Sequence, residues 1–378
     1  GWQLDNERDA EIGSSDRICY NPACKAAWTE WLKKNYHTPS ELNQRMGLNS
    51  WGMQFLKIED VPLPRPSIDP PGQPMLEVAC TRFKKDAILD FFAEQTAILR
   101  REGVKQIILT DWCARNITPV DDPRINDILD MSGVNIYQPS EDSEWSWEET
   151  TYIQDLNRSV NGNNRFFETE TRIGVTGGQQ IWGAAHMPQQ LRMWMIEAAA
   201  FGAIGVIHWS GNRWTGGHWP HWGGVLDWSG TPEPDYQVTA EIGAFFKKWG
   251  TTITTNPVKA TAAVITDFDQ RSALHFFPHA NTDIWYNILV RSFDAFHRLG
   301  MGVDGLNMKM ASDASVLKKY SVVVLASDAV LDNKEVIEAL TIYVKQGGKI
   351  IVTCFNAYQT WDGLMRNDGF AVNLKEIT

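Results

Sequence analysis

Residues 105–111 read KQIILTD, a short apolar run that ends in a carboxylate. This run predicts a buried strand, and residues 86–101 before it carry apolar side chains at helical spacing and end at Gly103. The same alternation continues to about residue 250, with strands expected to end near Glu7, Tyr137, Glu170 and Trp209 and helices over residues 122–131, 148–160, 188–201 and 236–249. A series of this kind predicts a parallel sheet that carries its functional groups at the carboxyl ends of the strands.

The number of strands in residues 1–250 is informative. Five strands are expected, whereas a closed barrel of this type has eight. If the fold is such a barrel, its first three strands are expected upstream of Gly1, and the missing initiator Met agrees with this.

The pattern changes after residue 250. Residues 251–257, TTITTNP, are polar and predict a linker, and a second βα series occupies residues 258–378. Its strands are expected over residues 261–266, 321–326 and 349–353, and its helices over residues 284–299 and 334–346. This arrangement predicts a small doubly wound domain. The chain has no Gly-x-Gly-x-x-Gly and no phosphate-binding loop, so nothing indicates nucleotide binding.

Cys354 follows the last of these strands, at the place where a thiol nucleophile lies in an amidotransferase. Its neighbours Thr353 and Phe355 are not the glycines that such a sharp turn requires. We therefore do not expect catalysis by Cys354.

Composition excludes several classes of function. The net charge is −11 and there is no basic cluster, which argues against nucleic acid and against an anionic membrane surface as partners. No apolar run approaches the ~18 residues of a spanning helix, and the first residues do not form a signal peptide. Five cysteines are too few and too irregular for a disulfide framework, which favours a reducing compartment such as the cytoplasm.

Tryptophan is unusually frequent. The chain has 17, and seven of them fall between Trp182 and Trp228. Indole faces stack on the C–H faces of sugars, so this cluster suits a carbohydrate site, although tryptophan also fills apolar cores.

Glu7 and Glu170 each close a segment that predicts a strand, GWQLDNE at residues 1–7 and RFFETE at residues 165–170. Two carboxylates at the ends of separate strands can cleave a glycosidic bond, one as the proton donor and the other as the nucleophile or as the base for water. Asn6 precedes Glu7 and could bind the neighbouring sugar hydroxyl. The alternative is that both glutamates are solvated charges at strand ends. Glu168 is the rival nucleophile, because a two-residue period puts it on the same strand face as Glu170.

Several segments resemble glycoside hydrolase family 42, the β-galactosidases, within the large clan of retaining barrel glycosidases. They are WQLDNE (residues 2–7), ICYNPACKAAWTEWLKKNYHTPSELNQRMGLNSWG (residues 18–52), the run ending in VPLPRP (residues 61–66), and FETETRIG (residues 167–174). Residues 262–352 resemble the second domain of the family. The resemblance implies an α/β chain with strands 4–8 of a (β/α)8 TIM barrel, followed by a flavodoxin-like or amidotransferase-like domain that lacks amidotransferase activity and makes trimer contacts. It also implies that the natural chain extends beyond residue 378.

The resemblance assigns roles to individual residues. Glu7 resembles the acid/base, Glu170 the nucleophile, Asn6 the sugar-binding amide and Tyr137 the aromatic residue near the nucleophile. Trp182 resembles a tryptophan of the pocket wall. In the loop after the last strand, Arg213, His218 and His221 are expected to replace the polar grip of the family on the sugar, and Trp219 or Trp222 to wall the sugar subsite. The alternative is that this loop folds on its own aromatic cluster at the rim of the barrel.

The chain departs from the family in two places. The zinc turn of the family has Cys-x-Cys-x-x-Cys, whereas this chain has Cys19, Asn21 and Cys24 at those places. Two thiolates do not make a closed tetrahedral site, so no metal is expected. The loop HWSGNRWTGGHWPHWGGVLDWSG at residues 208–230 contains no Glu, although the family grips galactose hydroxyls with Glu and His.

The sequence thus predicts a retaining exo-glycosidase, a hydrolase of terminal β-D-galactosides that needs no cofactor and forms a homotrimer. The carboxyl groups of Glu7 and Glu170 are expected about 5–5.5 Å apart, with Glu7 protonated and Glu170 ionised. The alternatives are another β-glycosidase, an α-L-arabinopyranosidase, or a non-catalytic carbohydrate-binding or assembly protein.

Overall fold

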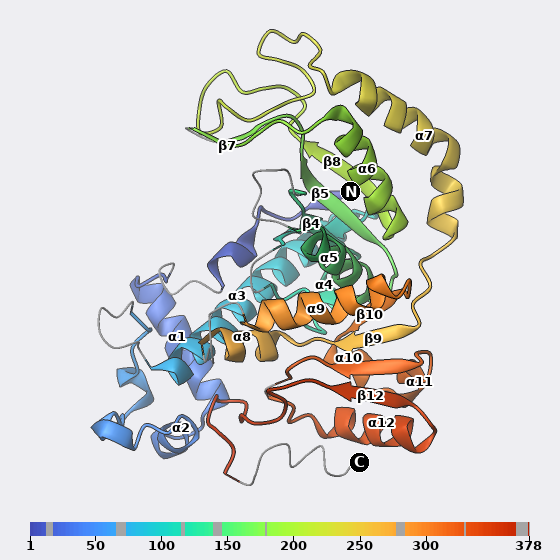
Figure 1. Ribbon diagram of the computed structural model, residues 1–378. Helices are drawn as coiled ribbons and strands as arrows, with labels where there is room; N and C mark the ends of the chain where they lie inside the picture. Colours follow the sequence, from blue (N-terminus) through green and yellow to red (C-terminus); the bar gives the residue numbers. More distant parts are fainter. Residues whose placement is uncertain are drawn as a thin grey trace.

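The computed structural model describes residues 1–12, 18–65, 73–114, 118–138, 146–177, 180–276, 284–328, 330–367 and 377. The chain forms two α/β units, an N-terminal unit that ends with helix α7 and a C-terminal unit that begins at strand β9 (Figure 1). In the described part of the chain, no helix is both long enough and apolar enough to cross a bilayer.

The N-terminal unit is built on parallel strands in sequence order. They are β1 (Trp2–Gln3), β2 (Ile108–Leu109), β3 (Asp111–Cys113), β4 (Ser132–Asn135), β5 (Phe166–Arg172) and β8 (Ala203–Trp209). Only Thr110 separates β2 from β3, so the two are one interrupted strand, and the pairs run β1–β2 and then β3–β4–β5–β8. The five expected strands are therefore confirmed, and among the described residues β1 and β8 are the open edges.

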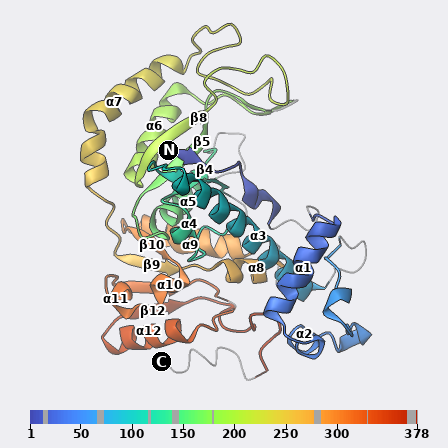
Figure 2. The same cartoon turned by 180° about the vertical axis from the view of Figure 1, so that it is seen from behind.

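The helices of this unit pack around the sheet, except for the first two, which lie to its side (Figure 1). The larger ones are α1 (Pro22–Asn35), α2 (Pro39–Arg45), α3 (Pro74–Arg101), α5 (Trp147–Ser159), α6 (Pro188–Ala200) and α7 (Tyr236–Thr255). Shorter elements are the helix α4 (Ile125–Ile128), the 3-10 turns η1 (Arg8–Glu11), η2 (Ser50–Gly52) and η3 (Ile58–Asp60), and the hairpin β6 (Thr176–Gly177) with β7 (Ile181–Gly183). Helix α5 begins with a capping box between Ser146 and Glu149. Seen from behind, α3 crosses the unit diagonally and reaches α1 (Figure 2).

Part of the expected linker is helical. Residues 251–255 form the last turn of α7, and only residues 256–257 of the linker lie outside it. The threonine hydroxyls lie along the helix instead of breaking it, because Thr254 donates to the Gly250 carbonyl oxygen at 3.0 Å and Thr255 to that of Thr251 at 2.8 Å. These threonine hydroxyls thus form their hydrogen bonds within the helix.

In the described part of the C-terminal unit, four parallel strands run in the order β10–β9–β11–β12. The strands are β9 (Ala262–Ile265), β10 (Val303–Leu306), β11 (Val322–Leu325) and β12 (Lys349–Val352), and the helices are α8 (Phe268–Phe276), α9 (Ile284–Arg298), α10 (Met308–Ala311), α11 (Ala314–Leu317) and α12 (Lys334–Lys345). Helix α9 lies over one face of the sheet and α12 over the other (Figure 1). The strand order reverses between β9 and β11, which confirms a doubly wound sheet.

The two units share a core through α5. Every residue from 149 to 159 is buried, and the Tyr152 ring meets the ring of Phe293 on α9 at 5.0 Å. Strand β10 approaches α5 so closely that a Cβ on Gly305 would lie 3.0 Å from the side chain of Leu156. This close approach explains the glycine in β10, a strand that the sequence pattern did not reveal.

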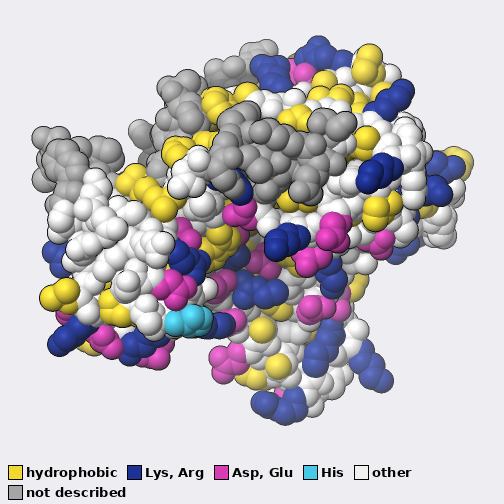
Figure 3. Space-filling view, turned by 90° about the horizontal axis from the view of Figure 1, so that it is seen from below, with side chains coloured by type: hydrophobic (Ala, Val, Ile, Leu, Met, Phe, Trp, Pro, Cys, Tyr) yellow, Lys and Arg dark blue, Asp and Glu magenta, His cyan; other side chains and the backbone are white. Residues whose placement is uncertain are grey.

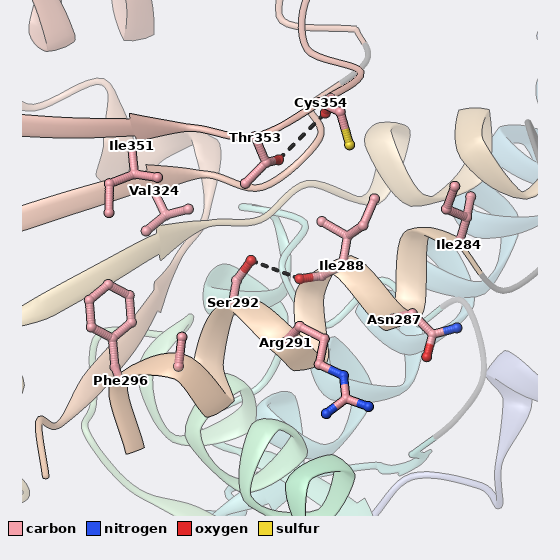
Figure 4. Close-up of a pocket in the computed structure, with 11 residues that line it drawn as sticks. Ile284, Asn287, Ile288, Arg291, Ser292, Phe296, Val324, Ile351, Thr353 and Cys354 are labelled. Carbon is pink, nitrogen blue, oxygen red and sulfur yellow. Dashed lines mark hydrogen bonds between the residues drawn. The ribbon is translucent and has the colours of Figure 1, made fainter. Parts of the chain in front are cut away.

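A groove of about 480 Å³ lies between α9 and the strands β11 and β12 (Figure 4). Its lining includes Ile288 and Phe296 on one side and Ile351 and Cys354 on the other. No His, Asp or Glu occurs among the described residues that line it, so the Cys354 thiol has no base there.

Acidic and basic side chains are interspersed on the face of the molecule seen from below, and neither sign forms a continuous patch there (Figure 3).

Candidate active site

Glu7 follows β1 in a left-handed conformation, with φ 47° and ψ 42°. Its backbone N–H donates to Oδ1 of Asp111 at 3.1 Å. Its carboxylate Oε1 accepts from Nδ2 of Asn135 at 2.8 Å. Because a left-handed residue other than glycine is disfavoured, these two contacts matter for holding the Glu7 carboxyl at the sheet edge.

Glu170 lies on β5 and is partly buried. Its Oε2 accepts a hydrogen bond from the hydroxyl of Tyr137, which follows β4. Asn135, the last residue of β4, pairs with Glu170 in the sheet register. Asn135 therefore lies between the carboxyl groups of Glu7 and Glu170.

A β-bulge corrects one expectation about this strand. Val134 pairs with Glu168, but the next residue, Asn135, pairs with Glu170, so Thr169 is the extra residue. Glu168 and Glu170 therefore point to opposite faces, and the expectation that they share a face is wrong. The Glu168 side chain is fully buried, and its Oε1 accepts from Nε2 of Gln138 at 2.6 Å.

Glu168 faces the helices on the outside of the sheet. Burial raises the pKa of Glu168 to about 8. The hydrogen bond from Gln138 acts in the opposite direction, whereas the negative charge of Glu197 on α6 contributes to the increase. A carboxyl in this place cannot reach a substrate at the strand ends. Glu168 is therefore a buried structural acid, which leaves Glu170 as the candidate nucleophile on this strand.

The protonation of Glu168 predicts a specific pH dependence of stability. An ordinary glutamate titrates near 4.5, so the stabilising effect of its bound proton is complete below that pH and is lost as the pH rises through about 8. We expect Glu168→Gln to keep the acceptor for Gln138 and to remove this loss. Between pH 6 and pH 9 the melting temperature of the variant should fall by roughly a few degrees less than that of the wild type. An equal fall in melting temperature between pH 6 and pH 9 in the two proteins would contradict the assignment of Glu168 as a buried protonated acid.

Four carboxyl groups interact electrostatically at the site, those of Glu7, Asp9, Asp111 and Glu170. Burial raises the pKa of Glu170 to about 7, with the Tyr137 hydrogen bond opposing the shift and the charge of Glu7 adding to it. Burial likewise raises the pKa of Asp111 to about 6, and the charge of Glu7 contributes. The direction of this shift favours the protonated form of Glu170, whereas the expected role of a nucleophile requires the ionised form.

Sequence reasoning missed Asp111 and Asn135 as site residues. Asp111 is fully buried, and its two carboxylate oxygens accept from Glu7 N and from Asn135 Nδ2. The available signal was position, because Asp111 closes the KQIILTD run and Asn135 lies near the end of the next expected strand. Polar residues at the ends of successive parallel strands converge on one edge of the sheet.

An aromatic wall extends from Tyr137. The rings of Tyr137 and Trp222 meet edge to face at 5.4 Å, and those of Trp222 and Trp219 at 5.5 Å. Trp222 is buried, and its Nε1 donates to the Trp209 carbonyl oxygen at 2.5 Å. The His218 ring lies 4.7 Å from that of Trp219. The aromatic wall thus connects the loop at residues 208–230 to Tyr137, whose hydroxyl donates to Glu170.

The other expected binding residues lie in different surroundings. Arg213 forms an ion pair with Glu233 at 2.8 Å and lies over the Trp228 ring at 4.7 Å. Glu233 follows the loop at residues 208–230, which itself contains no Glu. His221 is exposed, and so is Asn6, whose backbone N–H donates to Oδ1 of Asp5. The backbone of Trp182 belongs to β7, and its side chain lies outside the described residues.

The residues at the zinc turn of the family do not fit a metal. Cys19 and Cys24 are not joined by a disulfide, and the side-chain oxygen of Asn21 accepts from Cys24 N at 2.8 Å as the cap of α1. Asn21 is therefore engaged with the helix, and two thiols leave a tetrahedral site incomplete. Among the described side chains, no cluster of three or more His, Cys, Asp or Glu is arranged to hold a metal ion.

Comparison with known proteins identifies relatives of this chain. The chain is 25% identical over 379 residues to beta-galactosidase BgaA of Clostridium cellulovorans, with 100% of this chain and 55% of that protein covered. It is 24% identical to beta-galactosidase BgaH of Haloferax lucentense, with 93% and 52% covered. The chain thus spans about half the length of the curated relatives it matches.

Solved structures show the same fold. A beta-galactosidase from the psychrophilic Marinomonas ef1 superposes with a TM-score of 0.85 at 20% identity, over 100% of this chain and 58% of that one. The beta-galactosidase from Bacillus circulans sp. alkalophilus gives 0.86 at 22%, over 99% and 54%. The expected fold class is confirmed as part of a TIM barrel followed by a second α/β domain.

Two family models cover most of the chain. Residues 260–378 match the beta-galactosidase trimerisation domain. Residues 1–249 match the glycoside hydrolase family 42 model, described as beta-galactosidase. The chain therefore belongs to glycoside hydrolase family 42.

Proposed function

We propose that the protein is a retaining exo-glycosidase that releases terminal β-D-galactose. The observation that carries this proposal is the convergence of Glu7 and Glu170 on Asn135 at the carboxyl ends of the strands. Asn135 donates to Glu7, and Tyr137 beside it donates to Glu170. The named activities of the relatives support galactose as the sugar.

The reaction has two steps. In the first, Glu7 gives its proton to the glycosidic oxygen while the carboxylate of Glu170 attacks the anomeric carbon, and the bond to the leaving group breaks. In the second, the Glu7 carboxylate takes a proton from water, the water oxygen attacks the anomeric carbon, and the bond to Glu170 breaks. Retention by this route requires carboxyl groups about 5–5.5 Å apart, which stays a prediction.

Tyr137 assists the nucleophile in this scheme. Its hydroxyl donates to Glu170, and a hydrogen bond to the charged form of a carboxyl favours ionisation. This bond opposes the effect of burial, which raises the pKa of Glu170 to about 7. The Tyr137 hydrogen bond thereby offsets part of the cost of ionising Glu170 in the place where it must attack.

The aromatic wall and the loop around it supply sugar recognition in this proposal. Trp219 and Trp222 form a wall beside Tyr137, and indole faces pack well on sugar C–H groups. Asn6, Trp182, Arg213, His218 and His221 complete the proposed contacts with the sugar.

His221 provides a direct test of the loop. The side chain is exposed, so its removal should cost little stability, whereas loss of a hydrogen bond to a sugar hydroxyl weakens transition-state binding. We expect His221→Ala to lower kcat/KM at least tenfold, which corresponds to about 1.4 kcal/mol. Unchanged activity together with a melting temperature lower by several degrees would make the loop a packing element.

The full-length protein should be assayed on a panel of nitrophenyl glycosides. Fastest hydrolysis of the β-D-galactoside supports the proposal, and preference for the α-L-arabinopyranoside or another β-glycoside would change the sugar but keep the mechanism. Binding of galactose without hydrolysis of any glycoside would identify a carbohydrate-binding protein instead.

We also propose that the protein acts as a homotrimer in the cytoplasm. The match of residues 260–378 to a trimerisation domain supports the assembly, and five cysteines without a disulfide among them suit a reducing compartment. Light scattering on the full-length protein measures the assembly directly.

A further inference from the structure

We propose that Thr169, Asn135 and Asp111 form a hydrogen-bonded relay that orients the proton donor Glu7, with all three acting as positioning residues. The inference rests on the proposed function, because it concerns the acid/base role of Glu7. The bulge in β5 is the structural origin of the relay, since the extra residue Thr169 turns toward Asn135 and away from the helices.

The side chain of Asn135 is at the centre of the relay and is 1% exposed. Its Nδ2 donates to Glu7 Oε1 at 2.8 Å and to Asp111 Oδ2 at 3.1 Å. Its Oδ1 accepts from the Thr169 hydroxyl at 2.8 Å. An amide has two N–H donors and one carbonyl oxygen, so each part of this side chain is engaged.

The partners decide which end of the amide faces Glu7. An ionised Asp111 can only accept, and a hydroxyl at Thr169 can donate, so the NH₂ group is directed to the carboxylates and the oxygen to Thr169. Rotation of the amide by half a turn would place its oxygen against the carboxylates of Glu7 and Asp111. The relay thus keeps a donor, and not an acceptor, beside the carboxyl that moves the proton.

Asp111 adds a second contact with the same residue. Its Oδ1 accepts from the backbone N–H of Glu7 at 3.1 Å, and Glu7 has a positive φ. One buried carboxylate therefore fixes the backbone of Glu7 and, through Asn135, the side chain of Glu7. This arrangement places the Glu7 carboxyl without any contact with substrate.

The proposal predicts that the main effect falls on the step in which Glu7 donates its proton, because the hydrogen bonds of the Asn135 NH₂ group go to Glu7 and Asp111. In the first step Glu7 protonates the leaving oxygen, and this assistance matters when the leaving group is a strong base. Phenolate requires the proton, whereas 2,4-dinitrophenolate is a weak base that departs without it. A misplaced Glu7 should therefore slow cleavage of phenyl galactoside and spare cleavage of the dinitrophenyl compound.

The chain offers a matched control. Thr171 is buried on the same strand, and its hydroxyl donates to the amide oxygen of Gln138 at 2.5 Å. That amide binds Glu168, on the opposite face of the sheet from Glu7. Thr169→Val and Thr171→Val thus remove equivalent hydroxyls, and only the first acts through Asn135.

The experiment measures kcat/KM of the full-length protein on both aryl galactosides. Thr169→Val should lower kcat/KM for phenyl galactoside about tenfold and leave that for the dinitrophenyl compound within about twofold, the size expected from one misplaced hydrogen bond. Thr169→Ser keeps the hydroxyl and should restore the wild-type ratio. Thr171→Val should leave the ratio unchanged, and the ratio does not depend on how much protein is folded.

Two results would overturn the relay. Equal losses on both substrates in Thr169→Val, or the same ratio in the Thr169 and Thr171 variants, would show that Thr169 only packs, while the proposed function would stand. If the wild type hydrolyses neither galactoside, the proposed function fails and the relay fails with it.

Discussion

Replacing Glu170 by alanine should lower kcat by about 10⁴-fold or more, because the variant has no group that can form the covalent bond to the sugar. Added azide should restore part of the rate. Azide fits the space left by the carboxylate and attacks from the same side, so the product should be the α-galactosyl azide. In Glu7→Ala the covalent intermediate still forms from activated substrates, and azide should then give the β-galactosyl azide. Product analysis by NMR identifies the two anomers.

Glu168→Gln is the control for this experiment. The carboxyl of Glu168 lies on the same strand as that of Glu170, but it accepts a hydrogen bond from Gln138 on the outer face of the sheet. Activity should remain close to that of the wild type. A loss of activity in Glu168→Gln as large as that in Glu170→Ala would contradict the assigned roles. The same azide anomer from Glu170→Ala and Glu7→Ala would also contradict them.

Asp121→Ala should destabilise the protein by about 3–5 kcal/mol, because it leaves an uncompensated buried charge. Arg271 on α8 forms an ion pair with Asp121 in the N-terminal unit, and both side chains are buried. The guanidinium also donates to the Thr118 carbonyl oxygen at 2.6 Å. Denaturant unfolding of the variant measures the loss.

Arg298 provides the comparison. It also links the two units, through Glu148 at 3.1 Å, but its side chain is 58% exposed. Water screens such a pair, so Arg298→Ala should change stability far less than Asp121→Ala. Similar losses in the two variants would show that burial does not decide the strength of these contacts.

The parts of the fold that depend on local pattern could be predicted from the sequence. Apolar runs gave the strands of the N-terminal unit, and the charges at the ends of these runs gave Glu7 and Glu170. The parts that depend on contacts between distant segments could not be predicted. Strand β10 was missed because a strand with a polar residue and a glycine, VDGL, gains its stability from α5.

The candidate site shows the same division. The expectation for Glu168 failed because a bulge is set by the register between β4 and β5, which the sequence of β5 alone does not contain. Asp111 and Asn135 were missed because their role comes from contacts with Glu7, which is more than 100 residues away in the chain. Residues 251–255 were assigned to a linker because the segment is polar. In α7 the threonine hydroxyls donate to backbone carbonyl oxygens of the same helix, so the polarity does not break the helix.

The burial of α5 on all sides has a consequence for recombination between family members. The family models divide the chain between residues 249 and 260, but α5 lies within the first part and provides much of the surface on which β10 and α9 pack. A chimera joined near residue 255 would pair a foreign C-terminal unit with the unmatched side chains of Tyr152 and Leu156. Modular exchange in this architecture therefore requires α5 to be transferred, or redesigned, together with the unit it contacts.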